Sequence, residues 1–187
     1  VEGRVHHLKN LAKGTRYLPY ATSLRMGPLG YQSDAQSAIN VSYNSLSSYA
    51  RSLYDALTQP YPPYAAIGLT NNKQHVQLSD ALLQIENEFY GSIRPKQPIQ
   101  SGERPLLALN RRGVEYVEVR CVDLDPYEDI GISRETIAFL DTFLLFCLTS
   151  KSSKDSPEEN RSDSENQYLT AERGRDPALK LTRNNNY

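Results

Sequence analysis

Glu118 and Arg120 are the two residues whose types and spacing most clearly suit chemistry. They lie in the segment 113–120, where polar residues alternate with β-branched or aromatic ones, and this pattern predicts a β-strand. Side chains two residues apart on a strand share a face, so the carboxylate and the guanidinium project together. A rigid strand could hold them ready for a metal ion and a phosphate. A surface ion pair between neighbouring strands is the alternative.

A second polar pattern covers residues 83–90, which we predict to be a strand. Its alternation places Gln84, Glu86, Glu88 and Tyr90 on one face. Acidic side chains on a sheet face repel one another unless cations neutralise them, and magnesium with nucleotide phosphates is one natural neutraliser. Two cations follow in the segment 92–96, although a charged turn has the same composition.

Residues 16–31 combine aromatic residues, small residues and arginines around turn formers. Aromatic walls with an arginine suit a small zwitterionic ligand, because the guanidinium can take a carboxylate through two parallel hydrogen bonds. An ordinary packed loop is the alternative. We interpret the vicinal pair His6 and His7, and also His75, as surface residues.

Two apolar helices are predicted to position these segments. The first covers residues 44–59 and ends before Pro60, with a Tyr/Pro-rich loop after it. The second starts after Ser133 and runs to about Thr149. The predicted buried stripes are Leu46, Tyr49, Ala50, Leu53, Tyr54 and Leu57 on the first helix, and Ile137, Leu140, Phe143, Leu144, Cys147 and Leu148 on the second.

Residues 150–187 are much more polar than the rest of the chain. Ser156 and Pro157 nevertheless form a helix start, followed by two acidic residues in the first turn, so a solvated helix over 157–173 is predicted. We expect its packing partner to lie outside this chain, because the segment has few apolar residues to bury.

The composition excludes several classes of protein. The 187 residues suffice for one domain with a real core, and 21 basic residues balance 22 acidic ones. Neither nucleic acid nor a membrane is therefore an expected partner. The longest apolar run, 139–148, is about half of what a membrane span needs. Cys121 and Cys147 match no zinc spacing, and we interpret them as reduced core residues of a cytosolic protein.

Four stretches together resemble bacterial glutamate–cysteine ligase. They are residues 17–25 with 29–31, 83–90 with 93–96, 101–103, and 113–120. Their order along the chain makes the match specific. The likeness covers roughly residues 16–149 and continues more weakly to about residue 181.

The resemblance implies an ATP-dependent ligase that joins the γ-carboxyl group of L-glutamate to the amino group of L-cysteine through a γ-glutamyl phosphate. This is the first step of glutathione biosynthesis. The implied fold is α+β, part of a glutamine-synthetase-like antiparallel sheet with covering helices and bound Mg²⁺. By resemblance, Glu118 is a magnesium ligand and Arg120 is the catalytic residue that contacts the transferring phosphate. Arg25, Tyr31 and Tyr90 would line the cysteine and γ-glutamyl side of the site.

The resemblance also implies that the site is incomplete in this chain. Residues 1–150 correspond to the central part of the catalytic domain, and residues 151–187 to a polar, helical segment of the same domain. The family's other magnesium ligands precede this region, so we expect the missing flanking regions of the same polypeptide to complete the site. We expect a cytoplasmic protein and an inactive isolated chain. Two alternatives remain: a module that binds an amino acid or a nucleotide without turnover, and an inactive structural fragment.

Overall fold

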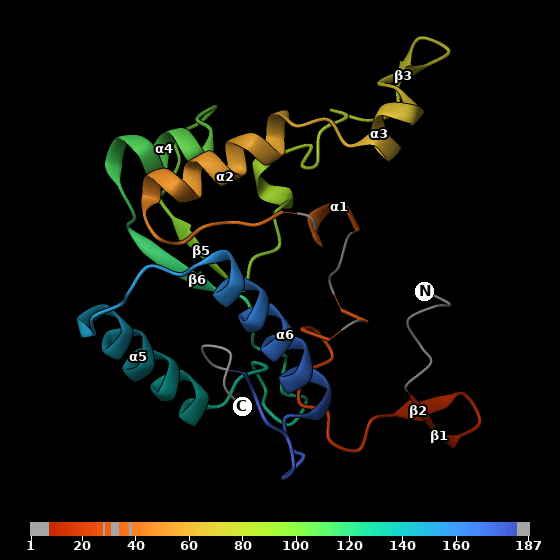
Figure 1. The fold of residues 1–187 in the computed structure, drawn as a ribbon, viewed down its shortest axis with the longest axis vertical. Coiled ribbons are helices and arrows are strands. Elements are labelled where there is room, and N and C mark those ends of the chain that lie inside the picture. Colours follow the sequence, from red (N-terminus) through yellow and green to blue (C-terminus); the bar gives the residue numbers. More distant parts are fainter. Residues whose placement is uncertain (1–7, 28, 31–33, 38, 183–187) are drawn as a thin grey trace. The chain divides into compact units, whose positions relative to one another are not determined.

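The computed structural model describes residues 8–27, 29–30, 34–37 and 39–182 (Figure 1). The chain divides into two compact units, which we call the 31–121 unit and the terminal unit, the latter joining residues 1–30 to residues 122–187. Within the described residues, helices are combined with three two-stranded antiparallel sheets, so the predicted α+β class is confirmed.

The elements of each unit follow in chain order. The 31–121 unit contains α1 (Asp34–Ser37), α2 (Leu46–Thr58), α3 (Pro62–Ile67), β3 (Thr70–Asn71), β4 (Gln74–His75), the 3₁₀ turn η2 (Glu86–Glu88), β5 (Ile93–Lys96), α4 (Pro105–Arg112) and β6 (Tyr116–Val119). The terminal unit contains β1 (Lys9–Ala12), β2 (Thr15–Tyr17), α5 (Arg134–Thr149) and α6 (Pro157–Arg173).

Helix α2 confirms the helix predicted over residues 44–59. Ser45 caps it: its Oγ accepts the backbone N–H of Ser48 at 3.0 Å, and the Ser48 Oγ accepts the N–H of Ser45 at 2.9 Å. Its buried side chains are Tyr49, Ala50, Leu53 and Ala56. The predicted stripe is wrong at Tyr54, which is 63% exposed.

The core of the 31–121 unit forms where α2 and α4 pack together with residues 81–89. Leu83 is fully buried, and its N–H donates to the carbonyl of Ala56 on α2 at 2.9 Å. Burying one leucine contributes about 1.5–3 kcal/mol, so this contact anchors the chain that leads to β5. The core cluster comprises Ala35, Val41, Tyr49, Leu53, Ala56, Leu82, Leu83, Phe89 and Leu109.

The predicted Tyr/Pro-rich loop after α2 is wrong over α3. Pro62 and Pro63 occupy the first turn of that helix. Proline is tolerated there because its missing N–H has no partner inside the helix anyway. The same prolines that prevent α2 from continuing therefore start the next helix.

The strand predicted over residues 83–90 is also wrong, because this segment is irregular and contains the turn η2. Glu86 is buried, and its Oε2 accepts the N–H of Leu106 at 2.8 Å in the first turn of α4. Glu88 accepts the N–H of Gln84 at 2.7 Å. These carboxylates satisfy backbone donors, so the alternation does not mark a polar sheet face.

Strand β6 confirms the strand predicted over residues 113–120. It pairs with β5 in an antiparallel register that places Arg94 opposite Glu118 and Lys96 opposite Tyr116. The N–H of Arg120 donates to the carbonyl of Ser92 at 2.8 Å, which continues the pairing beyond the strand end. Glu118 lies on β6, Lys96 on β5, and Arg120 directly follows β6.

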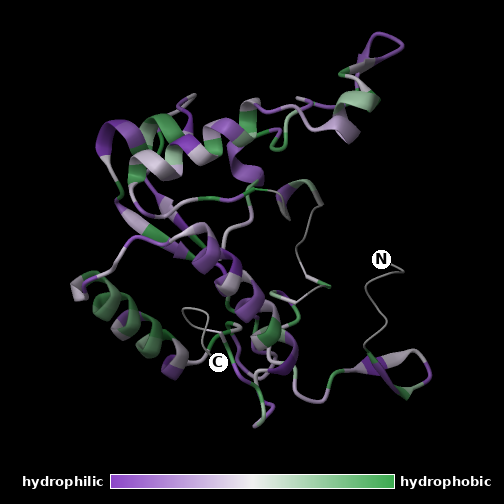
Figure 2. Ribbon diagram, viewed as in Figure 1, coloured by the Kyte–Doolittle hydropathy of each residue, from purple (hydrophilic) through white to green (hydrophobic). Residues whose placement is uncertain are grey.

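Helix α5 has the predicted bounds and the predicted cap, since the Ser133 Oγ accepts the N–H of Thr136 at 3.1 Å. The predicted buried stripe is wrong, because no residue of α5 is buried. Figure 2 shows hydrophobic residues along its whole length. Cys147 on α5 and Cys121 are free thiols as predicted, but both are exposed and neither is a core residue. None of the helices in the described ranges is long and apolar enough to cross a membrane.

Helix α6 confirms the helix predicted over 157–173, including a capping box between Ser156 and Glu159. The expectation that its partner lies outside the chain is wrong at its C-terminal end. Ala171 is buried, and its carbonyl accepts the N–H of Thr22 at 2.9 Å. The C-terminal end of this polar helix is thus held in part by backbone hydrogen bonds to the segment that precedes Arg25.

The uncovered surface of α5 leads to a prediction for the purified 187-residue chain. We expect it to bind a hydrophobic dye and to self-associate, because six large apolar side chains of one helix are exposed. The double substitution Phe143→Glu with Phe146→Glu should lower dye fluorescence while the far-UV circular dichroism stays unchanged. Tyr127→Glu, at an exposed tyrosine outside the helix, is the control. Unchanged dye binding in the double variant would contradict the assignment to α5.

Candidate active site

The pair β5 and β6 brings three of the predicted site residues together. The Nε of Arg120 lies 3.9 Å from Oε1 of Glu118, so these side chains project to one side as the alternation predicted. The Arg120 guanidinium also lies over the Tyr90 ring, with Cζ 5.5 Å from the ring centre. An arginine held by a carboxylate and an aromatic face has a restricted orientation, which suits recognition of an anion.

Glu118 carries a carboxylate oxygen that is shielded from water. Its Oε2 accepts no hydrogen bond, and the ammonium group of Lys96 lies 3.3 Å away. A shielded carboxylate oxygen needs a cation nearby, and Lys96 meets that need only through its charge. This oxygen is chemically suited to a divalent cation, since Mg²⁺ is usually held by one or two carboxylates together with waters and substrate phosphates.

The predicted acidic face around Glu118 does not exist. The carboxylate of Glu86 caps α4 and lies 3.4 Å from the Nε of Arg104, and Glu88 binds the backbone of Gln84. No group of three or more His, Cys, Asp or Glu side chains that could hold a metal ion occurs within the described residues. In this part of the chain Glu118 can therefore supply a single metal ligand.

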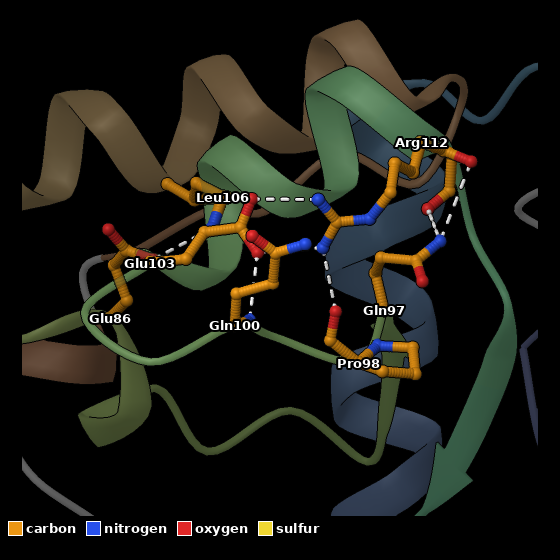
Figure 3. Close-up of polar contacts among 8 residues, drawn as sticks. Glu86, Gln97, Pro98, Gln100, Glu103, Leu106 and Arg112 are labelled. Atoms are coloured by element: carbon orange, nitrogen blue, oxygen red, sulfur yellow. Dashed lines mark hydrogen bonds and ion pairs between the residues drawn. The ribbon is translucent and has the colours of Figure 1, made fainter.

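A clamp between Glu103 and Arg112 fixes the loop that joins β5 to α4 (Figure 3). The two nitrogens Nη1 and Nη2 of Arg112 donate to the two carboxylate oxygens of Glu103 at 2.8 and 2.7 Å. Nη2 also donates to the carbonyl of Pro98 at 2.7 Å, and the N–H of Gln100 donates to Glu103 at 3.0 Å. This network holds the segment that follows β5, and with it the end of the strand that carries Lys96.

The clamp predicts an acid-sensitive stability. Hydrogen bonds from Arg112 and from the Gln100 backbone lower the pKa of Glu103 from 4.5 to about 2. Because the pKa of Glu103 is lower in the folded state than in the unfolded state, ionised Glu103 stabilises the fold. This stabilisation is fully present above about pH 4.5 and is lost as the pH falls toward 2. Glu103→Gln should lower the thermal unfolding midpoint at pH 6 and flatten its decline between pH 5 and 2. Glu115→Gln removes an exposed carboxyl outside the clamp as the control, and parallel pH profiles for both variants would contradict the prediction.

Arg25 lies in the terminal unit, in the segment 22–26. Its backbone N–H donates to Oδ2 of Asp123 at 3.3 Å, and the N–H of Leu24 donates to the same oxygen at 2.8 Å. Partial burial alone would raise the pKa of Asp123, but hydrogen bonds from Ser23, Leu24 and Arg25 hold it below its ordinary value. Tyr31, the other predicted residue of this region, lies outside the described residues.

A pocket of about 380 Å³ lies beside this segment, entirely within the terminal unit. Its walls are mostly apolar, and they include Tyr17, Leu18 and Leu24 together with the charged residues Arg16 and Glu172. Residues 16–31 thus line a pocket with one aromatic wall residue, and whether it takes a zwitterionic ligand stays a prediction. Of the two arginines in this segment, Arg16 is part of the pocket wall and Arg25 is not.

Two residues near the predicted ones were not identified from the sequence as parts of the site. Lys96 was noted only as a cation that follows a strand, and its contact with Glu118 depends on the pairing of β5 with β6. Asp123 carried no signal, because its partners lie about 100 residues earlier in the chain. The register of the two strands could have identified Lys96; nothing local could have identified Asp123.

Comparison with known proteins shows which family this chain belongs to. The sequence model of the family described as glutamate–cysteine ligase matches residues 1–170. The chain belongs to the glutamate–cysteine ligase family. It is 53% identical to the glutamate–cysteine ligase of Janthinobacterium sp. (strain Marseille) and 51% identical to that of Hahella chejuensis, in each case over 98% of this chain and 35% of the relative.

Solved structures of this family and of a related enzyme are similar to this chain. A crystal structure of the glutamate–cysteine ligase of Francisella tularensis in complex with AMP matches with a TM-score of 0.89 and 42% identity, over 96% of this chain and 36% of that one. A bifunctional glutathione synthetase from Pasteurella multocida matches with a TM-score of 0.56 and 26% identity, over 87% of this chain and 17% of that one. The chain spans about a third of the length of the curated family members it matches.

Proposed function

We propose that this chain is the central segment of a glutamate–cysteine ligase, which joins the γ-carboxyl group of L-glutamate to the amino group of L-cysteine with ATP, through a γ-glutamyl phosphate. The observation that carries the proposal is the group formed by Glu118, Arg120 and Tyr90 in a chain of this family. This group offers a carboxylate for a cation and an oriented guanidinium for a phosphate, which are the parts that phosphoryl transfer needs.

Arg120 would bind the equatorial oxygens of the transferring phosphoryl group. Its planar fork can make two hydrogen bonds to a phosphate, and Tyr90 and Glu118 limit how far the fork can turn. Glu118 would hold Mg²⁺ through the oxygen that accepts no hydrogen bond. Bound Mg²⁺ would neutralise part of the charge on the nucleotide phosphates. Lys96, 3.3 Å from that oxygen, adds positive charge where the phosphates would lie.

Arg25, Tyr31 and Tyr90 would line the side of the site that takes cysteine and the γ-glutamyl group. Arg25 supplies a guanidinium for a substrate carboxylate, and aromatic walls exclude water from an acyl phosphate that water would otherwise hydrolyse. Positioning the amine against the acyl carbon is the remaining task of such a site.

The rest of the site would come from flanking regions of the same polypeptide. We propose that β5 and β6 are two strands of a larger, glutamine-synthetase-like antiparallel sheet, and that further acidic ligands for Mg²⁺ lie on strands outside this chain. The share of 35% that the chain covers in its relatives supports this view. Residues 1–150 and 151–187 would belong to one catalytic domain, and the enzyme would act in the cytoplasm.

The test is an assay of the complete polypeptide with L-glutamate, L-cysteine and ATP. Phosphate release should match the amount of γ-glutamylcysteine formed, and release should require all three substrates. The isolated 187-residue chain should show no turnover, because its described residues supply one metal ligand, Glu118. Absence of product from the complete polypeptide would refute the proposal. Binding of an amino acid or nucleotide by a complete polypeptide that shows no turnover would favour the alternative of a binding module.

Tyr90 provides a test of the acceptor side. Tyr90→Ala in the complete enzyme should raise the KM for cysteine about tenfold, and the KM for ATP less than about twofold, because a wall of one subsite contacts one substrate. Tyr54→Ala, at an exposed tyrosine of α2, is the control and should change neither constant. Equal increases of both constants in Tyr90→Ala would show that Tyr90 acts only by supporting Arg120.

A further inference from the structure

The segment 22–26, which carries Arg25, is held by hydrogen bonds although none of its side chains is fully buried. Leu24 is 68% exposed, and Thr22 is exposed as well. Hydrophobic burial therefore does not explain why this segment keeps one conformation. Its backbone groups must be fixed by hydrogen bonds instead, and the described residues show where these bonds go.

Asp123 holds one side of the segment. Its Oδ1 accepts the Ser23 hydroxyl at 2.6 Å, and its Oδ2 accepts the N–H groups of Leu24 and Arg25 at 2.8 and 3.3 Å. The Ser23 Oγ in turn accepts the N–H of Met26 at 3.0 Å. Hydrogen bonds to an ionised carboxylate are among the stronger ones in proteins, so a single side chain restrains three successive residues.

The C-terminal end of α6 holds the other side. The carbonyl of Ala171 accepts the N–H groups of Thr22 and Ser23 at 2.9 and 3.3 Å, and the carbonyl of Thr170 accepts the Thr22 hydroxyl at 2.6 Å. The backbone before Arg25 is therefore restrained from two directions. An exposed segment restrained in this way is what a preorganised binding residue requires, because its side chain then starts from a fixed Cα position.

We propose that Asp123 is a positioning residue, which fixes the backbone of residues 23–25 so that the Arg25 guanidinium is presented to the carboxylate of an amino-acid substrate. The proposal rests on the ligase function proposed above. Asp123 does not touch the substrate. It acts through Arg25, and its removal should impair substrate binding only as far as Arg25 contributes to it.

A double-mutant cycle in the complete enzyme separates this role from a general loss of stability. Asp123→Ala should raise the KM for glutamate or for cysteine at least about fivefold, with the KM for ATP changed less than about twofold. In an Arg25→Ala background, Asp123→Ala should raise the same KM by less than about twofold, because residues that act through one contact are not additive. Asp123→Asn retains an acceptor oxygen and should lie between wild type and Asp123→Ala. Fully additive effects of Asp123→Ala and Arg25→Ala would overturn the proposal.

Asp125→Ala is the matched control. Its carboxylate accepts the N–H of Tyr127 at 2.9 Å two residues further along the chain, so the substitution removes the same charge and a hydrogen bond from a backbone N–H without loosening residues 23–25. It should leave all three KM values within about twofold of wild type. An increase equal to that of Asp123→Ala would overturn the proposal.

Hydrogen exchange provides a readout that needs no activity. The amides of Leu24 and Arg25 should exchange faster in Asp123→Ala than in wild type, while those of α2 stay unchanged. Unchanged exchange at Leu24 and Arg25 would overturn the proposal even in an active enzyme. If the complete polypeptide has no ligase activity, the proposed function fails. Faster exchange in Asp123→Ala would still show that Asp123 restrains the backbone of residues 23–25.

Discussion

Glu118→Gln in the complete enzyme is expected to lower ligase turnover at least about tenfold and to raise the magnesium concentration needed for half-maximal rate. Glutamine keeps the shape of the side chain but has no negative charge. Where the carboxylate oxygen that accepts no hydrogen bond now faces Lys96, the variant has a neutral amide group, which attracts a cation much less. A tenfold loss corresponds to about 1.4 kcal/mol of transition-state stabilisation, which is modest for a lost charge contact to a metal ion.

The measurement is a magnesium titration of initial rates, repeated with Glu115→Gln as the control. Glu115 is exposed and lies just before β6, so its substitution removes one charge from the same segment. Both variants should keep the thermal unfolding midpoint of wild type within a few degrees. An unchanged titration and unchanged turnover in Glu118→Gln would show that Glu118 is only the partner of Lys96 and Arg120 in a surface ion pair.

Arg120→Lys is expected to be nearly as inactive as Arg120→Ala, with turnover reduced by about a hundredfold in both. Lysine keeps the positive charge but has no planar fork, so it cannot make two parallel hydrogen bonds to a phosphate or stack on the Tyr90 ring in the same way. The loss should appear in kcat more than in the KM for ATP, because the contact is strongest when charge develops on the transferring phosphoryl group.

Single-turnover rates of phosphate transfer check this prediction, since they separate chemistry from product release. Arg111→Lys, at an exposed arginine in the last turn of α4, is the control and should keep wild-type rates. Near wild-type turnover in Arg120→Lys would rule out the phosphate contact. In that case Arg120 would act through its charge alone, and the ion pair with Glu118 would be its main role.

The sequence predicted the structural surroundings of some residues of the candidate site correctly and those of others incorrectly. The pairing of Glu118 with Arg120 follows from strand periodicity alone, and the structure confirms it at 3.9 Å. Tyr90 contacts Arg120 although residues 83–90 are not the predicted strand; it was the resemblance to the family that implied its place in the site. The motif that resembles the family was a better guide there than the alternation of polar residues.

The alternation of polar residues over 83–90 predicted the wrong surroundings for Glu86, because a carboxylate can accept a hydrogen bond from a backbone N–H in any part of the fold. Arg104 stands at the cap position of α4 and provides no capping side chain, so Glu86 from an earlier segment binds the N–H of Leu106. Similarly, the apolar character of α5 predicts a helix correctly but does not say what covers it. Periodicity describes one element and carries no information about its neighbour.

The sequence by itself determined the features that depend on neighbours along the chain. These are the starts of α2, α5 and α6, which serine caps mark, the end of α2 before Pro60, the strand β6, and the family itself. Only the tertiary structure decided that Lys96 meets Glu118 and that Asp123 holds the segment before Arg25. The physical reason is that hydrogen bonds and ion pairs form between whichever donors and acceptors the packing brings within about 3 Å, and local sequence does not encode partners about 100 residues away.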